Sequence, residues 1–134
     1  MTSSNAKTDI TDLLKHMDPQ LDVQRYAFAT VDPYVAASLD VVPTMSFIEN
    51  EGVTLILPEE DAIKANIAHE FICQKITLQV HSALEAVGFM AAISNKLLDV
   101  GVPCNVVAGF YHDHLFIPVD KVETAMAALK ELAG

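Results

Sequence analysis

The pattern of apolar and polar residues along the chain predicts an alternation of short helices and strands. Near the start, apolar side chains recur every three or four residues, which places them on one face of a helix. Elsewhere, runs rich in aromatic and β-branched residues, or runs in which every second residue is apolar, indicate strands. We expect helices within residues 5–17, 34–40 and 58–67, from residue 82 to residue 100, and after residue 120. We expect strands over residues 24–31, 44–49, 53–57, 71–80, 104–110 and 114–118.

The helix expected after residue 82 has the clearest start and end. Ser82 and Glu85 form a capping box, in which each side chain binds a free backbone N–H group of the first turn. Gly101, followed closely by Pro103, ends the helix. Its expected apolar face consists of Leu84, Val87, Ala91 and Leu98, with Gly88 and Ala92 beside them.

Two short segments recur at the same spacing of 60 residues. Val42-Pro43 returns as Val102-Pro103, and Thr54-Leu55-Ile56-Leu57-Pro58 returns as His114-Leu115-Phe116-Ile117-Pro118. In both copies the Val-Pro pair precedes a predicted hairpin, and the last proline precedes a predicted helix. Two matches at one spacing and in one structural context indicate an internal duplication.

Each copy contains a strand, a helix, a hairpin and a second helix, which is the beginning of a βαββαβ unit. We expect one half over residues 1–70, including the N-terminal helix, and a second half over residues 71–134. The second half has no strand after its last helix, so it either borrows one from the first half or keeps a three-stranded sheet. The strand at 71–80 can close the first half and open the second, so we expect shared or exchanged strands in one connected sheet.

Three segments of the second half resemble the ACT domain family. They are His81-Ser82-Ala83-Leu84-Glu85-Ala86-Val87-Gly88-Phe89-Met90-Ala91-Ala92, Gly101-Val102-Pro103-Cys104-Asn105-Val106-Val107, and Tyr111-His112-Asp113-His114-Leu115-Phe116-Ile117-Pro118. The first half, from Arg25 through the hairpin at 44–57, is similar to the ACT-like domain that precedes such a unit in that family. Apart from about its first 20 residues, the chain resembles small stand-alone tandem ACT proteins, and the ligand-sensing parts of aspartate kinases and of the cytosolic arginine sensor.

The resemblance implies an α+β, ferredoxin-like ACT fold, built as a tandem repeat of two ACT-like halves with shared or swapped strands. It implies that a small polar ligand binds at an interface between ACT units, near the loop joining the first strand to the first helix. It also implies side-by-side pairing of units, as in a homodimer or a higher oligomer, and it implies no catalysis.

Charge and cysteine content narrow the classes of partner and compartment. Eighteen acidic residues against eight basic ones give a net charge of −10, which disfavours nucleic acids and anionic membrane surfaces because both need a cationic patch. The sequence has neither the pattern of a signal peptide nor an apolar run long enough to span a bilayer. Cys73 and Cys104 lie in apolar stretches and are predicted to be buried free thiols of a cytoplasmic protein, with a disulfide between them as the second interpretation.

Four residues of the second half are candidates for binding the ligand. Ser82 would stand at a helix N-terminus, which attracts a carboxylate, or it serves only as the cap of that helix. Gly88, inside the expected helix, indicates close approach of a ligand or of another part of the protein, and Val87 would line the same place. Asn105 interrupts an apolar strand and either pairs with a donor and an acceptor of the ligand or faces water on an edge strand.

Tyr111-His112-Asp113-His114 gathers polar and aromatic side chains at the tip of the second hairpin. His112 and Asp113 are candidate ligand-binding residues if this tip lies near the ligand interface. His112 and His114 would share a strand face and could help to hold zinc, but no third and fourth ligands stand at motif spacing, so a solvated turn is the favoured interpretation. The sequence contains no nucleophile motif, Walker loop or dinucleotide-binding glycine motif.

The sequence therefore predicts a non-enzymatic regulatory module that binds a small polar molecule, an amino acid above all, and uses no cofactor. Two alternatives stay open. One is an adaptor that only pairs with itself or with another chain through its sheet. The other is a small metal-dependent enzyme built on His112 and His114.

Overall fold

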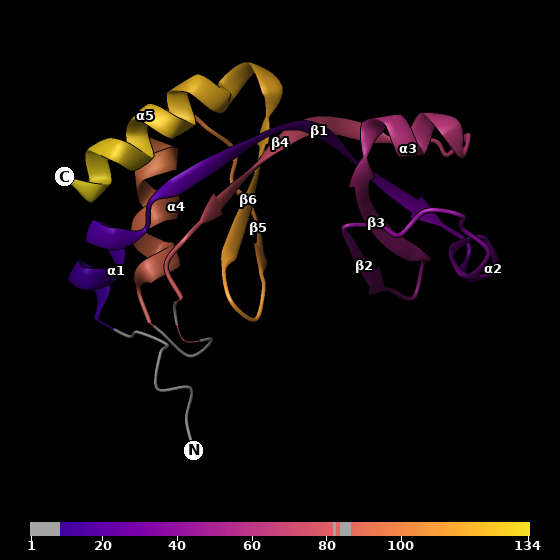
Figure 1. Ribbon diagram of the computed structural model, residues 1–134, viewed down its shortest axis with the longest axis horizontal. Coiled ribbons are helices and arrows are strands. Elements are labelled where there is room, and N and C mark those ends of the chain that lie inside the picture. Colours follow the sequence, from indigo (N-terminus) through magenta and orange to yellow (C-terminus); the bar gives the residue numbers. More distant parts are fainter. Residues whose placement is uncertain (1–8, 82, 84–86) are drawn as a thin grey trace. The chain divides into compact units, whose positions relative to one another are not determined.

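The chain folds into helices packed on a six-stranded antiparallel sheet, so the predicted α+β class is confirmed (Figure 1). The computed structural model describes residues 9–81, 83 and 87–134. The helices are α1 (Ile10–His16), α2 (Pro33–Ala37), α3 (Glu59–Lys64), α4 (Phe89–Asp99), the 3-10 helix η1 (Val119–Lys121) and α5 (Val122–Ala133). The strands are β1 (Pro19–Val31), β2 (Met45–Ile48), β3 (Val53–Pro58), β4 (Glu70–Leu78), β5 (Asn105–Ala108) and β6 (Asp113–Pro118), in the sheet order β2-β3-β1-β4-β6-β5. None of the described helices combines the length and apolarity that crossing a bilayer requires.

Two long strands, β1 and β4, are shared between two compact units. Val23–Cys73 forms one unit, which we call the inserted unit, and Met1–Asp22 together with Gln74–Gly134 forms the other, which we call the outer unit. Each of the two strands begins in one unit and ends in the other. The beginning of β1 therefore supplies the strand that the second half lacks after α5, and the alternative of a three-stranded sheet is wrong.

In the inserted unit, alternate side chains of the strands pack under α2 and α3. The apolar face of its sheet and the residues that cover it form one buried cluster, made of Ala29, Val53, Leu55, Leu57, Ala62 and Ile67. Ala62 belongs to α3, and Ala36 of α2 packs against the same cluster. Asp32 starts α2 as its N-cap, because its carboxylate accepts the N–H of Tyr34 at 2.8 Å.

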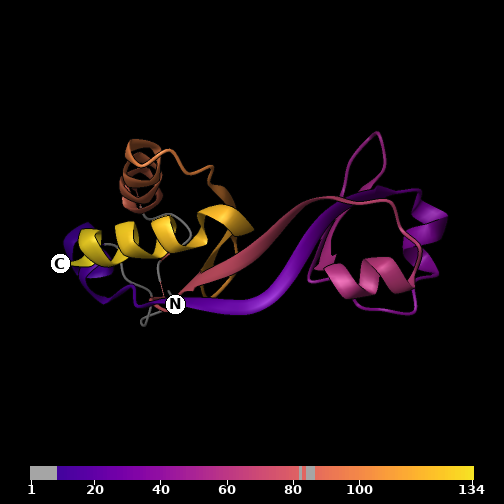
Figure 2. The same cartoon turned by 90° about the horizontal axis from the view of Figure 1, so that it is seen from above.

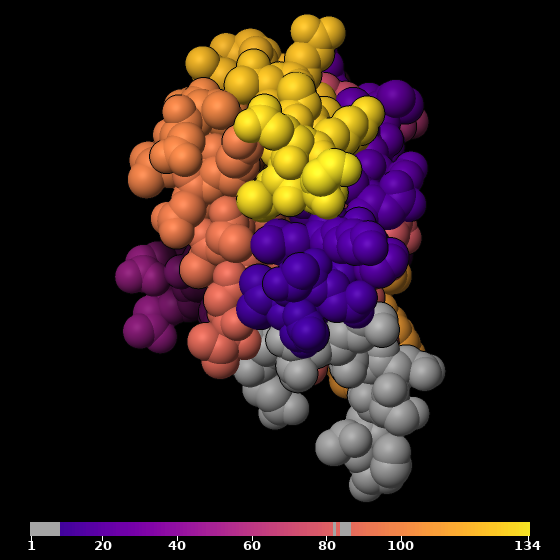
Figure 3. Space-filling view, turned by 90° about the vertical axis from the view of Figure 1, so that its left-hand side faces the viewer, coloured from indigo at the N-terminus to yellow at the C-terminus, as the bar shows by residue number. Residues whose placement is uncertain are grey.

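In the outer unit, α4 and α5 lie over one face of the strands (Figure 2). The N-terminal helix α1, in indigo, packs beside the yellow α5 (Figure 3). The core draws on all three helices through fully buried residues such as Leu13, Ile93 and Leu129. Met17, just after α1, is also fully buried, and its carbonyl accepts the N–H of Gln79 at 2.6 Å. The N-terminal segment is thus part of the core of the unit that the C-terminal half forms.

The two hairpins repeat each other residue by residue at the spacing seen in the sequence. In β2–β3, Met45 stands opposite Ile56 and Ile48 stands opposite Val53. In β5–β6, the residues 60 positions later form the same pairs, Asn105 with Phe116 and Ala108 with Asp113. β3 and β6 also share the same pattern of buried and half-buried positions. This register supports the internal duplication inferred from the sequence.

Helix α4 begins later than the sequence predicted. The predicted capping box at Ser82 and Glu85 falls outside the described residues, and the described helix begins at Phe89. Gly88 precedes the helix as its N-cap with φ +93°, a left-handed conformation that glycine adopts without a steric penalty. The prediction that Gly88 lies inside a helix is therefore wrong.

The buried face of α4 also differs from the predicted one. Phe89, Ile93 and Leu97, spaced four residues apart, are the buried residues of this helix. Val87 and Leu98, both assigned to the apolar face from the sequence, are 85% and 72% exposed. The predicted face assumed a helix running through Gly88, whereas a helix that begins at Phe89 presents the neighbouring row of larger side chains to the core.

Candidate functional site

The connection between β4 and α4 is the feature that most distinguishes the outer unit from the inserted unit. Asp32 alone joins β1 to α2, whereas β4 ends at Leu78 and α4 begins at Phe89; of the residues between them, 79–81, 83, 87 and 88 are described. This connection contacts the tip of the β5–β6 hairpin, because the rings of His81 and Tyr111 lie 5.6 Å apart between their centroids. Connection and hairpin tip together mark one end of the outer unit, which is our candidate site.

Gly88 brings the connection into α4 with its backbone turned to positive φ. An added Cβ there would meet Ile10 at 3.7 Å, an ordinary contact, so conformation and not space requires the glycine. Gly88 has no side chain to cap the first turn of α4, and the N–H groups at such an end attract an anion. Val87 is exposed beside it, and Ser82 lies outside the described residues.

The tip of the β5–β6 hairpin carries aromatic rings where its repeat carries acidic and amide side chains. The turn is closed by the N–H of Gly109, which donates to the carbonyl of His112 at 2.9 Å, as Glu49 N–H donates to Gly52 in the other hairpin. Phe110 and Tyr111 are 66% and 64% exposed, with their rings in edge-to-face contact at 5.1 Å. Their counterparts 60 positions earlier are Asn50 and Glu51.

Asp113 begins β6 opposite Ala108 and is 8% exposed, and among the described residues it is the one buried residue that is polar or charged. Its counterpart in the other hairpin is Val53, 7% exposed. The duplicated position therefore holds an apolar side chain in one unit and a carboxylate in the other. The exchange therefore replaces an apolar contact by a charged group, which is costly to bury unless it is paired.

His114, two residues after His112 of the turn, ties the same hairpin to β4. Its Nδ1 lies 2.8 Å from the hydroxyl of Thr77. Partial burial lowers the pKa of the His114 imidazole, the positive charges of Lys75 and His112 lower it further, and the charge of Asp113 opposes this shift. His112 itself is half-buried in the turn.

The contact between His81 and Tyr111 joins the two segments that contain four of the predicted residues, and a fifth lies elsewhere. Val87 and Gly88 lie in the connection, and His112 and Asp113 lie at the hairpin end that this connection contacts. Asn105 is exposed at the start of β5, opposite Phe116, and thus stands at the end of the hairpin away from the turn.

Sequence reasoning placed Tyr111 in the cluster at this hairpin tip but missed His81, Thr77 and Phe110 as members of this end. A signal was present in the internal repeat, because all six residues 109–114 differ from residues 49–54 while Leu115 and Pro118 repeat Leu55 and Pro58. The contacts of His81 and Thr77, by contrast, join segments distant in the sequence.

Metal and thiol chemistry find little support among the described residues. No three His, Cys, Asp or Glu side chains of the described residues are grouped as a metal site would require. Both cysteines are free; Cys73 is buried as predicted, whereas Cys104 is only partly buried. Burial raises the pKa of the Cys73 thiol to about 12, which disfavours the reactive thiolate.

Comparison with solved structures finds relatives over nearly the whole chain. A protein of unknown function from Vibrio cholerae, described as a possible transport protein, is 41% identical with a TM-score of 0.83, covering 92% of this chain and 95% of its own. The regulatory subunit of aspartate kinase from Thermus flavus is 12% identical (TM-score 0.65; 87% of this chain, 97% of that one). Its ligand-free counterpart from Thermus thermophilus is 13% identical (TM-score 0.68; 88% and 98%). No curated protein matches the chain.

Family models agree with the duplicated architecture. One model described as an ACT domain matches residues 5–74, and a second ACT domain model matches residues 70–131. The two matches meet in β4, the strand that both units share. The chain therefore belongs to the ACT domain family, as a tandem pair of ACT domains.

Proposed function

We propose that this protein is a non-enzymatic regulatory module of the cytoplasm that binds a free amino acid at the candidate site of the outer unit. The observation that carries the proposal is the divergence of one end of a duplicated fold. The long connection, the glycine at the start of α4 and the buried Asp113 all occur at this end of the outer unit. The regulatory subunits of aspartate kinase, which share the fold, are consistent with a regulatory role.

The proposed site offers hydrogen-bond donors for the carboxylate of a zwitterion and a carboxylate for its ammonium group. The N–H groups in the first turn of α4 suit the α-carboxylate of an amino acid, because the positive end of the helix dipole adds to their hydrogen bonds. The Asp113 carboxylate suits the α-ammonium group, with which it forms a charge-assisted hydrogen bond. His112 and Tyr111 at the turn are then available to the ligand side chain. In this proposal Asn105 binds no part of the ligand in the same unit.

Thermal unfolding and calorimetry with each of the twenty amino acids test the proposal. A ligand at about 100 times its Kd adds about 2.7 kcal/mol to the free energy of unfolding. Asp113→Asn should weaken the binding at least about tenfold, since a hydrogen bond to a charged group is worth about 1.5–3 kcal/mol. Asp120→Asn, at an exposed residue of η1, is the matched control and should bind as the wild type does. If no amino acid shifts the unfolding, the proposal is wrong.

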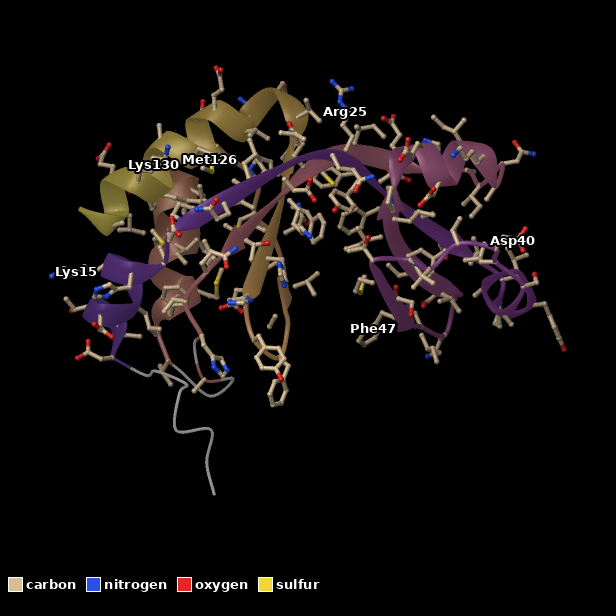
Figure 4. The ribbon with its side chains drawn as sticks, in the orientation of Figure 1. Lys15, Arg25, Asp40, Phe47, Met126 and Lys130 are labelled. Atoms are coloured by element: carbon tan, nitrogen blue, oxygen red, sulfur yellow. The ribbon has the colours of Figure 1, made fainter. Side chains whose placement is uncertain are left out.

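We also propose that the protein pairs with a second copy through β2, and this edge favours an adaptor as the second candidate function. β2 is an outermost strand of the sheet, and the segment 41–48 around it contains no charged residue. Phe47 and Ile48 of this strand are 61% and 83% exposed. Figure 4 labels Phe47 on β2. An uncharged, apolar edge strand invites pairing with another strand, and natural proteins usually protect such edges with charge.

Sedimentation of the wild type and of Phe47→Lys tests the pairing. A lysine on the edge should shift a dimer towards monomer, because it would place an unpaired charge between the strands. Ile63→Lys, on the exposed surface of α3, is the control and should leave the association unchanged. If the protein pairs but binds no amino acid, the adaptor is favoured over the regulatory module that binds an amino acid.

A further inference from the structure

The turn of the β5–β6 hairpin carries two aromatic rings that closing the turn does not require. In both hairpins the turn is closed by the same backbone hydrogen bond, from the N–H of its first residue to the carbonyl of its fourth. The hairpin of the inserted unit makes this bond with Asn50 and Glu51 at the positions of Phe110 and Tyr111. Polar side chains therefore suffice to close such a turn, and the two rings call for another explanation.

The ring of Tyr111 is oriented by two other rings and still open to solvent. Its centroid lies 5.1 Å from that of Phe110 at an interplanar angle of 72°, and 5.6 Å from that of His81 at 53°. Edge-to-face and tilted contacts of this kind favour a defined ring orientation. Tyr111 and Phe110 nevertheless remain 64% and 66% exposed. A ring surface that is oriented in advance loses little conformational freedom when a ligand covers it.

The two segments that meet at these rings contain no charged residue to receive a charged side chain of a ligand. Residues 100–112 include no Asp, Glu, Lys or Arg, and neither do the described residues of the connection between β4 and α4. In the neighbouring strands, the Lys75 ammonium lies 3.9 Å from the carboxylate of Asp22, and our proposed function assigns Asp113 to the α-ammonium group of the ligand. An uncharged side chain therefore suits this surface better than an acidic or a basic one.

We propose that the ligand of the outer unit carries an uncharged aromatic side chain, which packs on the rings of Phe110, Tyr111 and His81. This inference rests on the proposed function, because it names the class of amino acid that the candidate site takes. The class consists of phenylalanine, tyrosine and tryptophan. Contact between rings adds to the burial of apolar area, so phenylalanine should bind about tenfold or more tightly than alanine.

Calorimetry on the full chain tests the inference through the ratio of two affinities, for phenylalanine and for alanine. The double variant Phe110→Asn with Tyr111→Gln gives the turn the polar character of its repeat without adding a charge. It should lower the preference for phenylalanine at least about fivefold, the contribution of one aromatic contact, and leave the Kd of alanine unchanged. Tyr34→Gln, at an 86% exposed tyrosine of α2, is the matched control and should keep the preference. A merely structural effect of the double variant would weaken both amino acids alike.

Charged amino acids provide the opposing result. A basic side chain can also lie on an aromatic ring through a cation–π contact, so lysine and arginine are measured beside aspartate and glutamate. If one of these four binds more tightly than phenylalanine, the inference is overturned and the proposed function stands. The same conclusion follows if the double variant keeps the preference for phenylalanine over alanine.

An NMR titration with indole tests the ring surface without an amino acid. Indole should shift the ring signals of Phe110, Tyr111 and His81, and the shift at His81 should be lost in the double variant. Cyclohexanol, which is apolar but has no π-face, is the matched probe and should shift these signals less. If no amino acid binds, the proposed function fails and this titration decides: indole shifts at these rings support an aromatic ligand of another kind. Absent shifts, or equal shifts with cyclohexanol, would overturn the inference.

Discussion

At the scale of single residues, either backbone conformation or close packing can explain why position 88 holds a glycine. Its φ of +93° costs other residues about 1–2 kcal/mol, while its nearest neighbours leave space for a methyl group. Gly88→Ala should therefore lower the free energy of unfolding by about 1–2 kcal/mol, measured by urea denaturation. Asn95→Ala on the exposed surface of α4 is the control and should change it by less than about 0.5 kcal/mol. A variant as stable as the wild type would show that position 88 does not need glycine.

The two thiols give a second residue-scale prediction. Burial raises the pKa of Cys73 to about 12, and burial also raises the pKa of the less buried Cys104, against a hydrogen bond from Ser94. Since only the thiolate reacts, a disulfide reagent at mildly alkaline pH should label Cys104 slowly and Cys73 only after unfolding. Cys104→Ser isolates Cys73, and mass spectrometry follows the labelling. Equal labelling of Cys73 in the native and the urea-unfolded protein would contradict its burial.

At the scale of elements, the two hairpins and β1 show what a local sequence pattern can and cannot determine. Both hairpins were predicted within a residue or two, because their alternation and turn residues are local signals. The start of β1 at Pro19 was missed, since this part of the strand is defined by pairing with β4, as in the bond from the Gln74 amide to the Asp22 carbonyl. The candidate site was likewise predicted only where its residues are close together in the sequence. His112 and Asp113 stood out in a local cluster, whereas the contact of His81 with Tyr111 exists only in the fold.

Substitutions of Leu97 and Leu98 test which face of α4 is buried. Leu97 is fully buried and Leu98 is 72% exposed, although the sequence assigned the core face to Leu98. Leu97→Ala should lower the free energy of unfolding by about 2–5 kcal/mol, because it removes buried methyl groups and leaves a cavity. Leu98→Ala should cost less than about 0.5 kcal/mol. Denaturation in urea measures both, and the opposite ranking would restore the predicted face.

At the scale of the whole molecule, the duplication explains why the N-terminus belongs to the C-terminal half. An ACT unit begins and ends with a strand, yet the outer unit has no strand after α5. The chain supplies this strand from the beginning of β1, preceded by α1, and both pack into the outer unit. The first residues of β1 complete the outer unit, and its later residues begin the inserted unit. Two domains can therefore use one sheet without a linker between them.

This arrangement predicts that the chain tolerates a circular permutation at the junction of its two units. The permutant would begin at Val23 and continue after Gly134, through a flexible glycine-serine linker of about ten residues, into residues 9–22. Each unit would then be continuous in sequence. α1 would follow α5, the helix on which it packs. The permutant should therefore keep the far-ultraviolet circular dichroism and the dispersed methyl NMR signals of the wild type.

Deletion of residues 1–22 without reattachment is the matched control. It removes the fully buried Leu13 and Met17, each worth about 1.5–3 kcal/mol of apolar burial. It also leaves part of β4 without its neighbour on one side, an exposed edge that promotes aggregation. We expect this shortened chain to unfold or aggregate while the permutant stays folded and soluble. If both behave alike, the segment before Val23 does not act as the closing strand of the outer unit.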